Sequence, residues 1–213
     1  GGAGKSTLAK AVAAKMGIVY VDTGAMYRTV GLYMYENGIE LSDENGIISS
    51  LKNVNIKLEY ENGAQHIYLN GKCVDADIRT DVVSTYASGV STIQAVRDFL
   101  LDTQRDIAKS KDVIMDGRDI GTVVLPDAGL KIFMTANDEA RARRRYKELL
   151  EKGENVTFED VYQNMVKRDD KDKNRKIAPA VPADDAVLFD NTEYGLNESI
   201  DYVVELAKKR FSV

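Results

Sequence analysis

The sequence predicts an α/β fold in which helices flank a parallel sheet and a small antiparallel insert interrupts the alternation. Three observations predict it. A glycine-rich loop opens into an alanine-rich helix, several short apolar runs end in aspartate, and one stretch alternates apolar and polar residues between Asn-Gly turns. With 213 residues, 44% of them hydrophobic, the chain can bury a full core, and we expect one domain over 1–213.

The opening loop has the composition of a phosphate-binding P-loop. Gly1–Thr7 reads Gly-Gly-Ala-Gly-Lys-Ser-Thr, which is most of the pattern G-x-x-x-x-G-K-[ST]. Small residues over Gly2–Gly4 let consecutive backbone N–H groups curl around phosphates. Lys5 then supplies charge to the outer phosphates, and the Ser6 hydroxyl is positioned to hold Mg²⁺.

The helix predicted over residues 6–16 supports this interpretation. It carries Leu8 and Val12 on one face and is followed by Gly17, so its N-terminus points at the anion. We expect the motif's first glycine, and the strand that launches it, to lie ahead of Gly1. The competing interpretation is a flexible glycine-rich start that happens to precede Lys-Ser, and the attached helix counts against it.

Composition limits the function classes. The net charge of −5 argues against nucleic-acid and anionic-membrane partners, so we expect small ligands and a cytoplasmic protein. A single cysteine, Cys73, excludes an intramolecular disulfide and a cysteine metal cluster. A single histidine, His66, lies in an alternating stretch and is expected to be an exposed strand residue, which makes metal-histidine chemistry and Ser-His triads improbable.

The next segment predicts a strand, a loop and a helix. An apolar run over 18–21 ends in Asp22-Thr23-Gly24, and residues 26–36 have helical periodicity closed by Asn37-Gly38. Arg28 falls in the first turn of that helix, where a cation opposes the helix dipole. Such an arginine has an anionic ligand about as often as it is a plain surface residue.

An antiparallel meander is predicted over residues 54–74. Apolar residues alternate on either side of Asn62-Gly63 and again up to Asn70-Gly71, which are hairpin turns. We interpret the insert, about 54–79, as a small lobe on the rim of the site without chemistry of its own, with Cys73 as a packing residue.

A further strand ends in a cluster of charges. Helical patterns run from Thr80, including a long helix through Val96, Leu100 and Ile107, and the apolar run 113–115 then leads into Asp116-Gly117-Arg118-Asp119. Ligands of open α/β sheets lie at the carboxyl ends of the strands. Asp116 is in Walker-B position and can hold Mg²⁺ directly or through water. An ordinary polar turn remains the alternative.

The last third predicts two more strands and a lid. Strands are expected over 130–134 and 187–190. Asp138 is expected to cap a helix whose charges, Arg141 to Lys147, mostly form a solvated face. Thr157 and Asp160 have capping spacing for another helix. The stretch 167–176 is too charged to pack, so we expect a mobile loop there, within a lid of about 167–178.

Arginines beyond those needed for one triphosphate suggest a second anionic substrate. They recur at loops and helix starts after successive strands: Arg28, Arg97, Arg118, Arg168 and Arg175. Phosphoryl transfer depends mainly on positioning and on charge around the moving group, and a closing lid would exclude water.

The chain resembles the bacterial cytidylate kinases over nearly its whole length. The opening loop is shared by many nucleotide-binding families, but three further stretches in this order are specific. The four stretches are Gly2–Thr7, Asp22–Arg28, Asp116–Val124 with Pro126–Ala128, and Arg168–Arg175. The resemblance implies a P-loop nucleoside monophosphate kinase fold, with the meander as the insert of the longer bacterial enzymes.

The resemblance also implies an activity and a set of residues. It implies transfer of the γ-phosphoryl group of ATP to CMP or dCMP with Mg²⁺. Separately, we expect the chain to act as a monomer. The resemblance implies an ATP-binding set of Gly1, Gly2, Ala3, Gly4, Lys5, Ser6 and Thr7. The implied CMP-binding set is Thr23, Arg28, Ser88, Arg97, Gly117, Arg118, Asp119, Arg168, Asp172 and Arg175. The implied catalytic set is Lys5, Arg118, Arg168, Asp172 and Arg175, with Ser6 and Asp116 at the metal.

Within the CMP set the resemblance assigns separate tasks. Arg28 and Arg118 would grip the acceptor phosphate, Arg168 and Asp172 would meet the ribose, and Arg175 would bring lid charge to the phosphates. The set that reads the cytosine edge is Ser88, Arg97 and Asp119, which suits a base with one amino donor and several acceptors. This chain has lysines at positions 171 and 173, where members of the family frequently have arginines. The difference affects only the details of the lid.

Other functions remain open at this stage. One alternative is a kinase for another small acceptor, such as UMP or shikimate. Asp119 discriminates, because a uracil carbonyl would face its carboxylate without a proton between them. A nucleotide-dependent switch would have no use for the acceptor-side arginines, and no Asn-Lys-x-Asp guanine signature is present. An RNA-binding protein using Arg141 to Lys147 is disfavoured by the acidic total.

Overall fold

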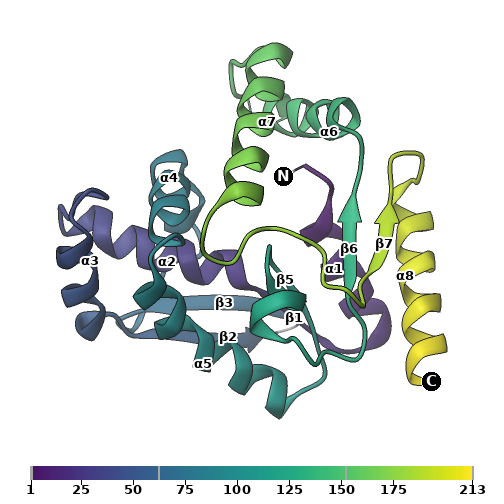
Figure 1. Ribbon diagram of the computed structural model, residues 1–213, viewed down its shortest axis with the longest axis horizontal. Coiled ribbons are helices and arrows are strands. Elements are labelled where there is room, and N and C mark those ends of the chain that lie inside the picture. The colour runs from purple at the N-terminus through teal and green to yellow at the C-terminus, as the bar shows by residue number, and fades with distance from the viewer. Residues whose placement is uncertain (1, 62, 152, 213) are drawn as a thin grey trace. The chain divides into compact units, whose positions relative to one another are not determined.

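The computed structural model describes residues 2–61, 63–151 and 153–212, which form two compact units (Figure 1). We call Gly17–Gly117 the central unit, and Gly1–Met16 together with Arg118–Val213 the terminal unit. Gly1, part of the predicted loop, lies outside the described residues.

Two parallel strands of the central unit end side by side in aspartate. Strand β1 (Val19–Asp22) pairs with β5 (Val113–Asp116), in a register that sets Asp22 opposite Asp116. Both strands follow the predicted apolar runs. The carboxyl edge of this pair therefore carries two carboxylates, as expected for a ligand-facing edge.

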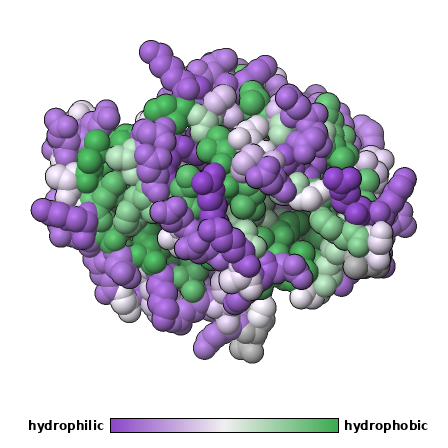
Figure 2. All heavy atoms as spheres, turned by 60° about the horizontal axis from the view of Figure 1, so that its bottom comes forward, coloured by the Kyte–Doolittle hydropathy of each residue, from purple (hydrophilic) through white to green (hydrophobic). Residues whose placement is uncertain are grey.

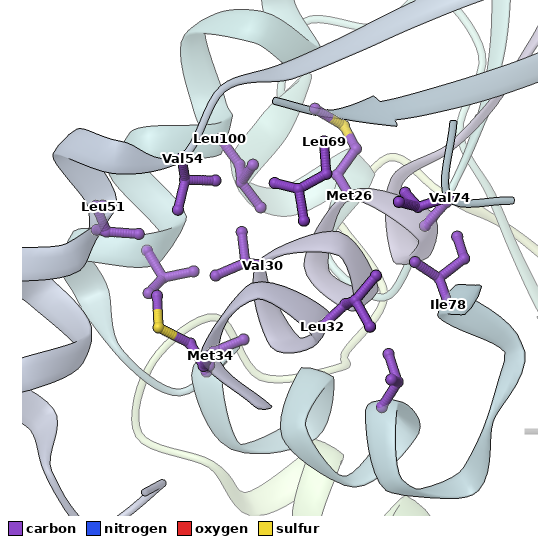
Figure 3. Close-up of a cluster of buried hydrophobic side chains, with 14 of the residues drawn as sticks. Met26, Val30, Leu32, Met34, Leu51, Val54, Leu69, Val74, Ile78 and Leu100 are labelled. Atoms are coloured by element: carbon purple, nitrogen blue, oxygen red, sulfur yellow. The ribbon is translucent and has the colours of Figure 1, made fainter. Parts of the chain in front are cut away.

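The core of the central unit lies around one helix. Helix α2 (Thr23–Glu36) packs against α4 (Asp81–Val90), α5 (Gln94–Ser110) and strand β3. Met26, Val30 and Met34 recur at helical spacing on its buried face, and each is 0% exposed. Figure 3 shows their side chains directed into one cluster with Leu69, Val74 and Leu100. The unit is completed by α3 (Glu44–Ser50) and the 3₁₀ turns η1 (Leu51–Asn53) and η2 (Asp77–Arg79).

The predicted meander is confirmed. Strands β2 (Ile56–Glu61), β3 (Ala64–Leu69) and β4 (Lys72–Cys73) form a separate antiparallel sheet. Asn70 and Gly71 have φ of 50° and 86°, the left-handed pair that a tight hairpin turn requires. Cys73 is exposed, so its predicted packing role is wrong; in a two-residue strand with Val74 turned to the core, Cys73 faces outward.

The terminal unit has its own parallel pair. Strand β6 (Ile132–Thr135) pairs with β7 (Val187–Asp190), α1 (Lys5–Met16) packs against α8 (Leu196–Phe211), and α6 (Asp138–Glu151) packs against α7 (Phe158–Asn174). A π-helical turn, η3, spans Ile120–Val124. The α/β class with parallel strands, flanking helices and an antiparallel insert is thus confirmed.

Two predicted helix starts differ from the structure. Helix α2 begins at Thr23 instead of Met26, because the Asp22 carboxylate accepts a hydrogen bond from the Ala25 amide and caps the helix earlier. Arg28 is consequently in the second turn. At α6 the cap is Asn137, whose Oδ1 accepts from the Ala140 amide at 2.7 Å, while Asp138 is already helical.

The expected mobile loop over 167–176 is wrong for most of its length. Helix α7 continues through Asn174, after a start at the predicted Thr157 cap. Its charged end is not solvated throughout, because Asp169 pairs with Arg141 of α6 and Asp172 pairs with Arg118. The Asn174 amide also donates to Asp170 at 2.7 Å, one turn earlier. These partners make helix favourable where composition alone favours a loop.

Hydrophilic residues cover most of the face drawn in Figure 2, with hydrophobic residues between them. Among the described helices, none is both long and apolar enough to span a membrane.

Candidate functional site

The opening loop has the backbone of a phosphate-binding nest. Gly2 and Gly4 have φ of 70° and 80°, in the left-handed region that glycine tolerates. Helix α1 follows at once, with its first hydrogen bond from the Leu8 amide to the Gly4 carbonyl and no acidic residue in its first turn. The amides of the first turn therefore point out of an uncompensated helix N-terminus, which suits an anion.

Residues of the terminal unit contact the opening loop and hold it in place. Asn191, just after β7, donates from Nδ2 to the Ala3 carbonyl at 3.1 Å, and Ala3 is buried. A Cβ at Gly2 would lie 2.8 Å from the Arg141 carbonyl oxygen and 2.9 Å from Met165 Cε, whereas one at Gly4 would meet nothing within 4 Å. The loop is thus walled on one side and open at Gly4, where a ligand can approach.

A second cluster lies at the end of β1 in the central unit. Arg28 Nη2 donates to Asp22 Oδ2 at 2.9 Å, and Arg79 lies 3.8 Å from the same oxygen. Thr23 donates to the Asp116 carbonyl at 2.8 Å, which ties α2 to β5. The Arg28 Nε is buried without a hydrogen-bond partner among the described residues, so this guanidinium has a donor left for an anion.

Arg97 and Ser88 lie on consecutive helices of the same unit. Arg97 is 6% exposed, donates to the Ser91 carbonyl at 3.1 Å, and has its guanidinium 5.6 Å from the centre of the Tyr27 ring. Ser88 is exposed near the end of α4. A buried arginine stacked on an aromatic ring is held in one orientation, as a base-reading residue must be.

The structure brings four predicted residues of the terminal unit together as two pairs. Arg118 Nε bonds to Asp172 Oδ2, and Arg175 Nη2 lies 4.0 Å from Asp119 Oδ1. Asp119 is 6% exposed, and Arg175 also donates to the Ala178 carbonyl at 2.5 Å. Two ion pairs of opposite orientation therefore connect the end of α7 with the residues just before η3.

The remaining predicted residues lie on α7, at the end of β5 and in the first turn of α1. Arg168 is exposed on α7, one turn before Asp172. Gly117 follows β5 directly, and Asp116 at the end of that strand has Tyr20 Oη 3.4 Å from its Oδ2. Lys5, Ser6 and Thr7 occupy the first turn of α1.

Arg141 is a positioning residue that the sequence reasoning missed. Its guanidinium pairs with both Asp138 and Asp169 and donates from Nε to the Ala136 carbonyl at 3.1 Å. It therefore fastens α7 to α6. Arg144 similarly donates to the Asn191 carbonyl at 2.9 Å, on the residue that holds the opening loop.

The expectation of a solvated face holds for the other basic residues of α6. Arg143, Arg145 and Lys147 pair only with glutamates along the helix in the ion pairs seen here, and Arg143 also lies over the Phe158 ring. The available signal was spacing, because Arg141 and Arg144 are three residues apart and therefore lie on one face of the helix.

Comparison with known proteins gives one consistent result. The family model described as cytidylate kinase matches residues 1–209. A cytidylate kinase of Thermosipho melanesiensis is 47% identical over 209 residues, covering 98% of this chain and 94% of the relative. Those of Caldicellulosiruptor bescii and Lactobacillus johnsonii are 45% and 41% identical over 208 residues, each covering 98% of this chain and 92% and 90% of the relative.

Proposed function

This chain belongs to the cytidylate kinase family, and we propose that the residues described above perform the transfer of the γ-phosphoryl group from ATP to CMP or dCMP. The products are ADP and CDP or dCDP. The main support for the proposal is the backbone of the opening loop. Gly2 and Gly4 both have positive φ, and they lie directly before the N-terminus of α1, whose first turn contains no acidic residue.

Gly2 to Thr7 hold the phosphates of ATP. The amides of the loop and of the first turn of α1 donate to phosphate oxygens, and Lys5 neutralises the charge that develops on the moving group. Gly1 is included in this proposal from the sequence alone, because it lies outside the described residues.

The oxygen donors fit Mg²⁺. Ser6 supplies a hydroxyl beside the phosphate loop, and Asp116 supplies a carboxylate at the end of β5. Such hard oxygen ligands are the ones that magnesium prefers, usually with several waters retained. When bound, the ion would neutralise phosphate charge during transfer.

Arginines hold and orient the acceptor. Arg28, with its buried free Nε, and Arg118 bind the CMP phosphate, and Arg97, Ser88 and Asp119 read the cytosine edge. Thr23 and Gly117 line the same nucleotide.

The end of α7 supplies the lid charges. In the structure Arg118 pairs with Asp172, and Arg175 Nη2 lies 4.0 Å from Asp119 Oδ1, so these partners are exchanged for substrate on binding. On binding, Arg168 and Asp172 meet the ribose and Arg175 turns to the phosphates. A lid over about 167–178 then excludes water, so that the phosphoryl group passes to CMP.

We further propose that the chain acts as one kinase domain, as a cytoplasmic monomer, on small-molecule substrates. Each substrate needs only residues of a single chain in this scheme, so a second copy is not required. The −5 net charge gives no electrostatic reason for a nucleic-acid or membrane partner.

The defining experiment is a coupled ADP-release assay with ATP and Mg²⁺, offering CMP, dCMP, UMP and AMP separately. We expect rapid release with CMP or dCMP only, because Asp119 accepts from the cytosine amino group and repels the uracil carbonyl. Chelating Mg²⁺ should stop the reaction. Release that ignores the acceptor would point to a switch or an ATPase, and release with UMP alone to another acceptor.

A glycine substitution tests the phosphate loop. We expect Gly2→Ala to raise KM for ATP about tenfold, since a methyl group against the Arg141 carbonyl and Met165 must displace the loop. Gly17→Ala is the matched control, because Gly17 has a similar φ of 69° but nothing within 4 Å of its added Cβ. Equal KM values for the two variants would show that the loop wall does not position ATP.

A further inference from the structure

Three potential metal ligands converge on the insert, far along the chain from the phosphate loop. The ligand atoms of His66, Cys73 and Asp75 all lie within 4.8 Å of one another. The family's reaction, as described above, uses none of them. Their chemistry, one imidazole, one thiol and one carboxylate, is that of zinc sites.

Strand register produces the convergence. Cys73 pairs with Tyr68 in the β3–β4 hairpin, and the Val74 amide donates to the Ile67 carbonyl. Ile67 and Val74 are 2% and 1% exposed and face the core. Side chains alternate along strands, so His66, Cys73 and Asp75 fall on the opposite face.

The carboxylate is held in place by the backbone. Asp75 Oδ1 accepts from the Ile67 amide at 2.8 Å, and Oδ2 lies 2.7 Å from His66 Nδ1. Burial acts to raise the pKa of Asp75, but the hydrogen bonds from the Ile67 amide, His66 and Cys73 outweigh it and hold the pKa below its ordinary value. The Asp75 carboxylate is therefore already hydrogen-bonded to both of the other two side chains.

Modest side-chain shifts would bring the three ligand atoms to tetrahedral spacing. His66 Nδ1 and Asp75 Oδ2 are 2.7 Å apart, and all three ligand atoms lie within 4.8 Å of one another, so the closest pair must open and any wider pair must close. Zinc with bonds of about 2.0–2.3 Å holds its ligand atoms about 3.3–3.7 Å apart. The His66 and Asp75 atoms would move slightly apart. Cys73 is exposed and free, and His66 and Asp75 are half-buried, so an ion can enter from solvent.

We propose that His66, Cys73 and Asp75 form a zinc-binding site on the insert, with water in the fourth position. Binding releases the Cys73 thiol proton to solvent and leaves the His66 imidazole neutral, with its proton on the nitrogen that does not bind the metal. Strand β4 is only two residues long, and the ion ties it to β3. Bound zinc would therefore stabilise the pairing of β4 with β3 at the edge of the insert.

The test uses the full chain, stripped of metal and then kept in excess Mg²⁺ so that sites preferring oxygen ligands are filled. Zinc is titrated calorimetrically, and Co²⁺ serves as a spectroscopic probe because a thiolate ligand adds a charge-transfer band. We expect one zinc ion per chain, about one proton released, and a higher Tm with zinc.

Two variants remove single ligands without removing the local hydrogen bonds of the backbone. Cys73→Ser should abolish the cobalt charge-transfer band, and Asp75→Asn, whose Oδ1 can still accept from Ile67, should weaken zinc binding at least about tenfold. The matched control is Asp77→Asn, an exposed carboxylate of the same insert paired with Lys72 at 2.8 Å, which should bind zinc normally.

The proposal is overturned if the unaltered chain takes up no zinc, or if Cys73→Ser and Asp75→Asn bind it as well as the control does. These readouts are independent of kinase activity, so they stand or fall separately from the proposed function.

Discussion

Replacing Lys5 with alanine is expected to lower kcat by about 10²–10³-fold, the loss typical of removing one charge-stabilising donor from a transition state. Lys5 opens α1 directly after the opening loop. In the proposed scheme its charge would act on the outer phosphates while the loop amides still bind the nucleotide. KM for CMP should change little. Steady-state kinetics in the coupled assay measure both parameters.

Lys15→Ala is the matched control for this prediction. Lys15 lies in the last turn of the same helix, half-exposed, with an ion pair to Asp201 at 2.5 Å. Surface pairs of this kind contribute about 0–1 kcal/mol to stability, so kcat should stay unchanged. Near-normal turnover of Lys5→Ala, with both variants folded by thermal unfolding, would refute the role given to Lys5.

Local signals predicted most of the fold. The phosphate loop, the strands ending in aspartate and the Asn-Gly hairpins each depend on a few adjacent residues. The turn at Asn70 and Gly71 needs positive φ at both positions, and Asn-Gly adopts that conformation more readily than most residue pairs. Such elements can be predicted because their cause lies within their own sequence.

What the sequence could not predict depends on distant partners. The charged end of α7 is helical because Asp169 meets Arg141 and Asp172 meets Arg118, 28 and 54 residues away in the chain. From composition alone, the same residues are predicted to form a solvent-exposed loop. The approach of His66 to Asp75 likewise follows from strand register, which a list of metal-binding residue types does not contain.

The residue roles came from the family resemblance, and the structure adds to them unevenly. It groups Arg118, Asp119, Asp172 and Arg175, which lie in two separate stretches of the sequence. It also shows a buried donor on Arg28 that sequence could not reveal. The assignment of each to phosphate, ribose or base stays a prediction, and Asp119 offers the most direct test.

Asp119→Ala should raise KM for CMP by about 10–150-fold and leave KM for ATP nearly unchanged. A hydrogen bond to a charged group contributes about 1.5–3 kcal/mol, and the buried Asp119 carboxylate would accept one from the cytosine amino group. Because Arg175 lies 4.0 Å from Asp119, the variant also loses a nearby countercharge, so thermal unfolding is measured alongside the kinetics.

Two further variants separate base recognition from packing. Asp119→Asn keeps the shape and one acceptor oxygen but removes the charge, so its KM for CMP should lie between those of the unaltered chain and Asp119→Ala. Asp184→Ala, an exposed carboxylate of the same unit, should alter neither KM. If Asp119→Ala instead raised both KM values equally, the residue would hold the lid arginine in place without reading the base, and discrimination against UMP would have to come from Ser88 and Arg97.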